Sequence, residues 1–188
     1  MARENCGRGD VDNPPSGPYS CLMNTRKKFR ILIALAFLSL FPVPQVEAEE
    51  EIPNLNLMTI NGQPWKLSDY KGQVVLINFF ATWCGPCRKE VPDLVTLQKE
   101  FGSKGLSIIG LAFNSDPEAV VRFAAKYKIN YPVAVYGKDD VKKYGGVSAV
   151  PTTFLVDRKG KLAGGAEGLV PKAVLEKKIK ELLKADDV

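Results

Sequence analysis

The sequence predicts an α/β domain in which a mixed β-sheet is covered on both faces. Two observations support this fold class. Short apolar runs, which are typical of buried strands, alternate with stretches whose apolar residues recur at helical spacing. The last part of the chain then reads as two antiparallel strands followed by an amphipathic helix, so parallel and antiparallel strands share one sheet. We place this domain at residues 49–188.

An export signal precedes the domain. Residues 26–30 are mostly basic, residues 31–41 carry no charge, and in Val46-Glu47-Ala48 small side chains stand at the positions that a signal peptidase reads. We therefore expect residues 23–48 to be a signal peptide that is cleaved after Ala48. The alternative is an uncleaved membrane anchor, although the apolar run is shorter than the ~20 residues that a spanning helix needs.

The chain before the signal peptide shows no apolar periodicity. Met23 stands where a signal peptide normally begins, so we expect residues 1–22 to be untranslated or disordered. Cys6 and Cys21 would then be absent from the mature protein. One pair of cysteines remains in an exported domain, where disulfide chemistry is permitted.

The first elements of the domain are short. After an extended lead-in at residues 49–56, residues 57–67 predict a small hairpin, because Asn61-Gly62 is a favoured hairpin turn. A short turn or helix is expected at residues 68–72.

A long strand and a long helix come next. Residues 74–80 form an apolar run that predicts a buried strand, and residues 88–101 read as a helix. Pro92 is expected to kink this helix, since proline lacks an N–H. Gly102 and Gly105 are expected to end it.

Two further strands enclose a second helix. Residues 106–112 and 131–136 read as buried strands. Between them, Ser115-Asp116-Pro117-Glu118 has the pattern of a capping box with proline in the first turn, which predicts a helix through Tyr127. The apolar face of this helix is expected to consist of Val120, Val121, Ala124 and Tyr127.

Four elements complete the domain. They are a short helix at residues 139–144, a strand at 153–156, its antiparallel return at 162–166 and a closing amphipathic helix at 171–183. Gly145-Gly146 is expected to stop the first of them, and residues 158–161 to form the turn between the two strands.

The chemistry is indicated by Trp83-Cys84-Gly85-Pro86-Cys87, between the predicted strand at 74–80 and the helix that follows. This position puts Cys84 at the N-terminus of a helix, where the dipole and free N–H groups favour a thiolate. A thiolate is the species that attacks disulfides, and Cys87 is near enough to close the ring and release the attacked partner. The motif predicts exchange between a dithiol and a disulfide.

Composition excludes several other chemistries. The chain contains no histidine, which removes Ser-His-Asp and Cys-His catalysis and His-ligated zinc or haem. Arg88 stands where covalent haem attachment would need histidine. A four-cysteine zinc site would need Cys6 and Cys21, so no metal and no cofactor are expected. The net charge of +5 is spread over a mixed-charge sequence, and no nucleic-acid partner is expected.

With these residues in view, the chain resembles the thioredoxin superfamily, and within it the exported thiol-disulfide oxidoreductases of the TlpA/ResA type. Three features carry the resemblance: the Trp83–Cys87 motif after a strand, Pro92 in the following helix, and Val150-Pro151-Thr152-Thr153-Phe154, which looks like the family's cis-proline loop. The resemblance covers about residues 50–184. It implies a thioredoxin-like fold, a mixed central sheet flanked by helices, with an N-terminal hairpin and a central strand–helix–strand insert at about 106–136.

The resemblance also implies roles for the site residues. Cys84 and Cys87 would form the redox-active disulfide, with Cys84 as the exposed attacking thiol and Cys87 as the buried resolving thiol. Pro151 in cis would leave the backbone of Val150 free to pair with an extended substrate. Trp83 would shield the site and contact the partner; the alternative is that Trp83 only packs.

One position departs from thioredoxins, which have a buried aspartate where this chain has Asn78, as the exported relatives do. A neutral amide cannot accept the proton of Cys87. Glu90 lies three residues after Cys87 and therefore on the same helix face, so it is a candidate acceptor. The alternative is an acid that only interacts with the helix dipole.

The function implied is that of an exported protein-disulfide reductase, in the periplasm or on the outer face of the cytoplasmic membrane. Its substrates would be protein disulfides, with apocytochrome c before haem attachment as one candidate, and its electrons would come from a membrane donor. Gly85-Pro86 is the dipeptide of reducing thioredoxins, and we expect a monomer. The alternatives are a thiol metallochaperone that carries copper through Cys84 and Cys87, and a thiol peroxidase on the same fold.

Overall fold

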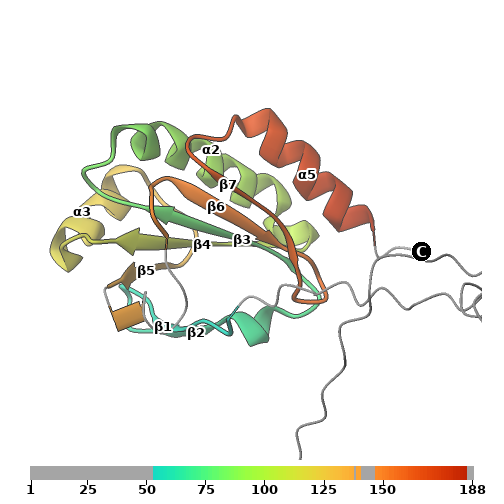
Figure 1. Cartoon of the computed structure of the whole chain (residues 1–188), viewed down its shortest axis with the longest axis horizontal. Helices are drawn as coiled ribbons and strands as arrows, with labels where there is room; N and C mark the ends of the chain where they lie inside the picture. The colour runs from blue at the N-terminus through green and yellow to red at the C-terminus, as the bar shows by residue number, and fades with distance from the viewer. Residues whose placement is uncertain (1–52, 138, 141–146, 186–188) are drawn as a thin grey trace, which may run out of the picture. The chain divides into compact units, whose positions relative to one another are not determined.

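The computed structural model describes residues 53–137, 139–140 and 147–185. They are organised around a five-stranded mixed sheet (Figure 1), as expected from the sequence. In spatial order its strands are β5 (Val133–Tyr136), β4 (Leu106–Phe113), β3 (Val74–Phe80), β6 (Thr152–Val156) and β7 (Leu162–Glu167). All seven residues of β3 are buried, because this strand is central and both faces of the sheet are covered. It pairs in parallel with β4 and antiparallel with β6.

Three helices pack on one face of the sheet. They are α2 (Gly85–Phe101), α3 (Pro117–Lys126) and α5 (Lys172–Lys184). Their buried apolar side chains, among them Leu94, Phe123 and Ile179, join Leu76 and Phe80 of β3 in one hydrophobic cluster. Alternate residues of β3 therefore point toward the helices and pack against them.

The other face of the sheet is covered by the N-terminal hairpin. Strands β1 (Asn56–Met58) and β2 (Pro64–Lys66) pair antiparallel around the expected Asn-Gly turn, where Gly62 has a φ of +72°. The 3-10 helix η1 (Leu67–Tyr70) follows. Trp65 of the hairpin is 2% exposed and belongs to a second hydrophobic cluster on this face of the sheet.

Helix α2 begins at Gly85, three residues earlier than the sequence predicted. The reason is that the side chain of Cys84 caps the helix and Pro86 occupies its first turn, a position that needs no N–H donor. The helix gives way at its C-terminus to the 3-10 turn η2 (Gly102–Lys104), and Gly105 ends the segment with a φ of +100°.

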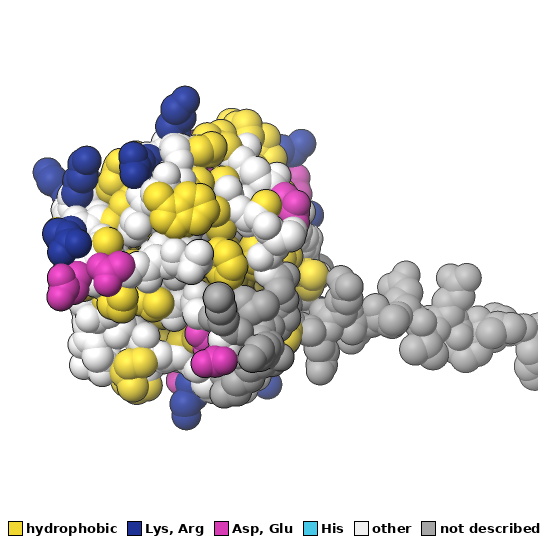
Figure 2. Space-filling view, turned by 60° about the vertical axis from the view of Figure 1, so that its left-hand side comes forward, with side chains coloured by type: hydrophobic (Ala, Val, Ile, Leu, Met, Phe, Trp, Pro, Cys, Tyr) yellow, Lys and Arg dark blue, Asp and Glu magenta, His cyan; other side chains and the backbone are white. Residues whose placement is uncertain are grey.

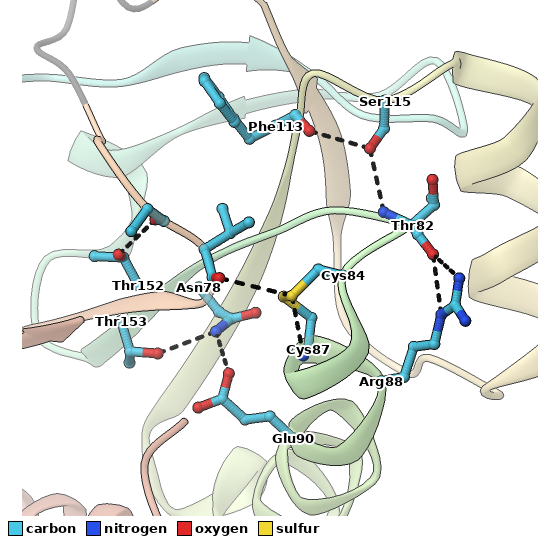
Figure 3. The surroundings of a disulfide bond; sticks show 12 residues. Asn78, Thr82, Cys84, Cys87, Arg88, Glu90, Phe113, Ser115, Thr152 and Thr153 are labelled. Carbon is cyan, nitrogen blue, oxygen red and sulfur yellow. Dashed lines mark hydrogen bonds between the residues drawn. A yellow bond between two sulfur atoms is a disulfide. The ribbon is translucent and has the colours of Figure 1, made fainter. Parts of the chain in front are cut away.

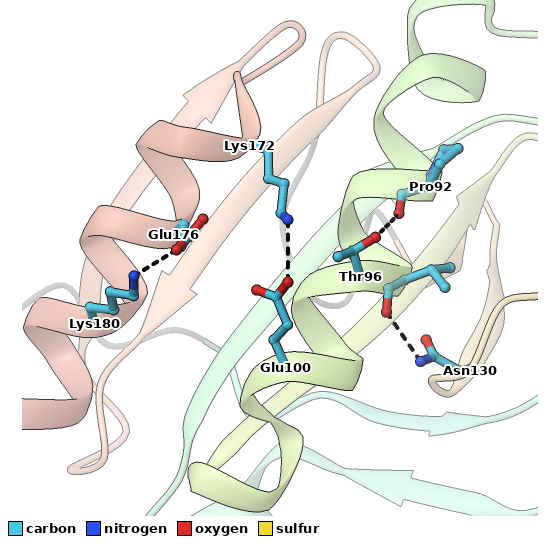
Figure 4. A network of polar contacts seen from close by, with 8 residues as sticks. Pro92, Thr96, Glu100, Asn130, Lys172, Glu176 and Lys180 are labelled. Carbon is cyan, nitrogen blue, oxygen red and sulfur yellow. Dashed lines mark hydrogen bonds and ion pairs between the residues drawn. The ribbon is translucent and has the colours of Figure 1, made fainter.

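Polar contacts tie α2 to its neighbours (Figure 4). Thr96 Oγ1 donates to the carbonyl of Pro92 at 2.9 Å, inside the helix. Asn130 Nδ2 donates to the carbonyl of Val95 at 3.1 Å, and Lys172 of α5 lies 3.5 Å from Glu100. The middle and end of α2 are thus joined both to the loop before β5 and to α5.

Helix α3 differs from the prediction at its start and on its apolar face. Its N-cap is Asp116, whose carboxylate accepts the N–H of Ala119 at 2.8 Å; Ser115 is not the cap. The capping-box pattern placed the cap at Ser115, whereas the carboxylate of the next residue, Asp116, caps the helix. Val121, expected on the apolar face, is 49% exposed, whereas Phe123 is buried.

The remaining expectations fall partly outside the described residues. Asp139 and Asp140 are helical, but the rest of the expected helix at 139–144 is outside, as are residues 1–22 and the signal segment at 23–48. No helix within the described ranges is both long and apolar enough to cross a bilayer.

The β6–β7 hairpin contains a close approach that can be tested. Gly165→Ala is expected to lower the free energy of unfolding by ~1–3 kcal/mol, because overpacking a filled site costs this much. A Cβ at Gly165 would lie 2.7 Å from Cδ1 of Phe154, whose ring is held edge-on to Phe79 at 6.0 Å between centroids. Urea unfolding measures the change. Gly164→Ala is the control, since a Cβ there meets no atom within 4 Å; equal losses in both variants would contradict the packing argument.

Candidate active site

The candidate site lies where β3 ends and α2 begins. Cys84 and Cys87 are joined by a disulfide, with a Cα–Cα distance of 5.3 Å. Cys84 is the N-cap of α2, and its sulfur accepts the N–H of Cys87 at 3.2 Å (Figure 3). When the pair is reduced, this donor and the positive end of the helix dipole favour a thiolate on Cys84.

Cys84 is nearly buried while the disulfide is closed. In this form it is 4% exposed, whereas the expected exposure concerns the reduced thiol and stays a prediction. The sulfur is covered because it is bonded to Cys87 on one side and lies 3.7 Å from the carbonyl oxygen of Val150 on the other. Cys87 is fully buried at 0%, so Cys84 is still the more accessible of the two.

The Val150–Pro151 peptide bond is cis, as expected, and this loop lies against the disulfide. Strand pairing brings the two segments together across the sequence: β6 pairs antiparallel with β3, and Phe79 is opposite Thr152. The end of β3 and the start of β6 therefore meet at the same edge of the sheet. Thr152 Oγ1 fixes the loop further by donating to the carbonyl of Ala149 at 2.8 Å.

The segment before Cys84 is held at both backbone polar groups of one residue, Thr82. The N–H of Thr82 donates to Ser115 Oγ at 3.2 Å, and the Thr82 carbonyl accepts from Arg88 Nε at 3.1 Å and Nη2 at 2.8 Å (Figure 3). Ser115 in turn donates to the carbonyl of Phe113 at 3.1 Å. These roles were not predicted from the sequence, in which Ser115 was interpreted as a helix cap and Arg88 only as the residue that stands in place of histidine.

Trp83 is fixed at one end and open at the other. Its indole Nε1 donates to the carbonyl of Asn114 at 3.2 Å, while the residue as a whole is 59% exposed. A tryptophan that served only for packing would bury most of its area. Its exposure beside the disulfide leaves a large apolar surface available to another molecule.

A buried carboxylate lies under the disulfide. Glu90 is 1% exposed; its Oε2 accepts from Asn78 Nδ2 at 2.9 Å and its Oε1 accepts the N–H of Val170 at 3.2 Å. Burial raises the pKa of Glu90 above its ordinary value and the charge of Asp93 adds to the rise, although the bonds from Val170 and Asn78 oppose it. An acid that only interacted with the helix dipole would stay solvated, so the burial of Glu90 argues against that alternative.

Asn78 connects this carboxylate to the cis-proline strand. Its Nδ2 also donates to Thr153 Oγ1 at 3.0 Å. Its Oδ1 is buried and has no hydrogen-bond partner among the described residues, and Figure 3 shows this oxygen on the side of the amide that faces the disulfide. A buried acceptor without a partner is uncommon and calls for an explanation. Reduction of the disulfide would create thiol donors on the side that this oxygen faces.

Comparison with known proteins agrees with this geometry. The sequence matches the Redoxin family over residues 47–183. The chain belongs to the Redoxin family. Among similar proteins, thiol-disulfide oxidoreductase ResA of Bacillus thuringiensis is 35% identical over 138 residues, which cover 73% of this chain and 80% of the relative. Thioredoxin-like protein YneN of Bacillus subtilis is 34% identical over 137 residues, covering 71% and 79%.

Solved structures extend the comparison to the fold. A thiol:disulfide interchange protein of the thioredoxin family from Chlorobium tepidum superimposes with a TM-score of 0.67 at 32% identity, covering 72% of this chain and 97% of the other. This Redoxin-family protein therefore has the thioredoxin-like fold that the resemblance implied, and it is a thiol-disulfide oxidoreductase of the ResA-like group.

In the reduced Redoxin-family protein, iodoacetamide near pH 6 is expected to label Cys84 before Cys87. The helix N-terminus raises the thiolate fraction of the first cysteine, and the second is fully buried. Mass spectrometry of peptides after a brief exposure gives the ratio of labels. Labelling in 6 M guanidinium removes the fold and serves as the control; equal labelling of both cysteines in the native protein would contradict the assignment.

Proposed function

We propose that the protein reduces disulfides of other proteins outside the cytoplasm, with Cys84 and Cys87 as its working dithiol. The observation that carries the proposal is the position of Cys84 Sγ at the first turn of α2, where it accepts the N–H of Cys87 at 3.2 Å. A thiolate at this point can attack a disulfide, and the second thiol lies within bonding distance to resolve the product.

The reaction proceeds in two exchanges. The Cys84 thiolate attacks one sulfur of the partner's disulfide; that bond breaks, a mixed disulfide forms, and the partner's other sulfur leaves as a thiolate that takes up a proton. Cys87 then loses its proton and attacks Cys84 Sγ, so the partner leaves with its second thiolate. Two electrons pass from the dithiol to the partner. The resulting Cys84–Cys87 disulfide needs an external dithiol, which we place in a membrane protein, to be reduced again.

The surrounding residues have supporting roles in this proposal. The Val150 backbone, next to Cys84, pairs with an extended segment of the partner, and Pro151 keeps that segment in place. Trp83 covers the partner's sulfur with its exposed ring. Glu90 receives the proton of Cys87, because burial raises the pKa of this carboxyl and so makes its carboxylate a better proton acceptor.

Location and partner rest on the sequence. Residues 23–48 would export the domain at 49–188 to the periplasm or to the outer face of the cytoplasmic membrane, whether the leader is cleaved or remains as an anchor. The resemblance to ResA-type proteins makes the Cys-x-x-Cys-His disulfide of apocytochrome c a candidate substrate. A similar solved structure is described as a thiol:disulfide interchange protein DsbE from Chlorobium tepidum, at 31% identity and a TM-score of 0.64. The proposal needs no cofactor, no metal and no nucleic acid, and treats the protein as a monomer.

The redox potential tests the direction of the reaction. Potentials of such pairs run from about −270 mV in thioredoxin to about −120 mV in DsbA. We expect a value near that of thioredoxin, because Gly85-Pro86 contains no histidine that would stabilise the thiolate and with it the reduced form. Equilibration with glutathione buffers, followed by alkylation and mass analysis, measures the potential.

Insulin reduction by dithiothreitol-charged protein is the companion assay, with the Cys84→Ser/Cys87→Ser protein as its blank. A protein left fully reduced in a mildly oxidising glutathione buffer would be an oxidant, and the assignment as a reductase would fall.

A further inference from the structure

A groove lies beside the disulfide, between the Trp83 segment and helix α3. Its volume is about 380 Å³. Trp83 and Arg88 line it from the motif side, and Arg122, Lys126 and Tyr127 line it from the side of α3. Arg122 and Lys126 are four residues apart, so they occupy one stripe of the helix and lie along the groove.

The charges of the groove have one sign. Three cations line it, and none of its described lining residues is acidic. Arg88 binds the carbonyl of Thr82 and, within the described part of the chain, forms no ion pair, so its charge is not neutralised by a carboxylate. Arg122 is partly neutralised at the start of α3, where Asp116 and Glu118 lie 3.9 and 3.4 Å from its guanidinium.

Aromatic rings complete the surface. Trp83 is 59% exposed, and Tyr127 lies half-buried with Lys126 Nζ 5.7 Å from its ring centroid. Figure 2 looks onto the side of the domain where α2 starts and α3 lies; it shows Lys and Arg side chains along one edge, with acidic side chains beside them, and hydrophobic patches among other atoms across the middle. Rings flanked by cations suit a polypeptide that carries both apolar side chains and carboxylates.

We propose that this groove holds an acidic segment of the protein partner, next to the partner's reactive cysteine. The inference rests on the proposed function, because Trp83 immediately precedes Cys84 and a chain bonded to Cys84 must leave the site over the adjoining surface. Arg88, Arg122 and Lys126 are exposed side chains around a shallow groove, and the aromatic rings between them suit a polypeptide that carries carboxylates. The groove would thus favour one class of partner by charge.

Matched peptides test the charge preference. The reduced protein is mixed with peptides that share one internal Cys-x-x-Cys disulfide and differ only in three flanking residues, which are Glu, Gln or Lys. Each set is made with the flank before or after the cysteines, and oxidation of the protein is followed by tryptophan fluorescence in a stopped-flow instrument. At low salt the Glu peptide is expected to react ~3- to 10-fold faster than the Lys peptide. A cleft lined by positive charges attracts negatively charged ligands and raises their association rate. At 1 M salt, where the Debye length is about 3 Å, the preference should vanish.

Charge variants locate the effect. Lys126→Glu is expected to reduce the preference for the Glu peptide to about half or less, and Lys126→Gln to give an intermediate value. Lys159→Glu is the matched control, because it makes the same change in net charge in the exposed turn between β6 and β7, at the opposite end of β3; its preference should equal that of the wild type.

The outcomes separate the inference from the function. If the Glu and Lys peptides react at equal rates and the protein also reduces the disulfide of the Gln peptide, the inference is overturned and the proposed function stays intact. Failure to reduce any of these peptides would overturn both the inference and the proposed function. Binding to phosphatidylglycerol vesicles that Lys126→Glu abolishes, with peptide preference unchanged, would assign the groove to lipid and overturn the proposal.

Discussion

A Cys87→Ser variant will accumulate as a mixed disulfide with its partner, and its turnover in insulin reduction will fall by at least ~100-fold because the resolving nucleophile is gone. Cys84 keeps its place at the N-terminus of α2 and can still attack. The intermediate then persists, since serine cannot displace the partner from Cys84. Non-reducing gels and intact mass measure the trapped species, and expression in the native host identifies the protein that is caught.

The reciprocal variant supplies the control. Cys84→Ser should show the same loss of turnover and no trapping, because a fully buried Cys87 cannot reach a partner's disulfide. A partner captured through Cys87 in the Cys84→Ser protein would reverse the assigned order of attack.

Replacing Glu90 by Gln should slow exchange by about 100-fold near neutral pH, the lower end of the effects seen when a proton-transfer group is removed. Glutamine keeps the size of the side chain and an oxygen for the N–H of Val170, so the fold should persist. The pH profile should also lose one ionisation. Stopped-flow rates from about pH 5 to 9 measure both effects; an unchanged profile would leave Glu90 with a structural role only.

The raised pKa of Glu90 also predicts how stability depends on pH. Because burial raises the folded pKa above the unfolded value of about 4.3, the carboxyl contributes its full stability below that value. The contribution is lost as the pH rises through the folded pKa, since the folded state must then hold a buried charge. The free energies of unfolding of the wild type and Glu90→Gln, measured with urea, should converge at acid pH. At higher pH they should diverge, with the variant more stable. Glu181→Gln, an exposed change on α5, is the control and should track the wild type.

Local patterns predicted the elements that depend on local chemistry. The apolar run at Val74–Phe80 and the Asn61-Gly62 turn gave the right strand and hairpin, because burial and turn geometry are encoded in neighbouring residues. The same reasoning chose Ser115 over Asp116 as a cap. In the structure the Ser115 hydroxyl instead accepts the N–H of Thr82, which lies 33 positions earlier in the sequence and could not be anticipated from the local pattern.

The site was predicted in part for the same reason. The spacing of Cys84, Cys87 and Glu90 on one helix is local, so it could be read directly. The cover over Cys84 comes from Val150, 66 residues further on, and depends on the pairing of β3 with β6. The contact between Glu90 and Val170 spans 80 residues. Only the resemblance to a known family indicated that Val150 lies beside Cys84, and nothing in the sequence indicated the contact between Glu90 and Val170.

The anchoring of Thr82 has a consequence for engineering. Arg88 and Ser115 hold this residue from outside the Gly85-Pro86 dipeptide, and Trp83 is held separately by Asn114. Gly85 and Pro86 can therefore be replaced while the contacts that hold Thr82 and Trp83 stay in place. A library that varies only these two positions would yield a graded series of reagents, from strong reductants to oxidants, that all present the same face to their targets.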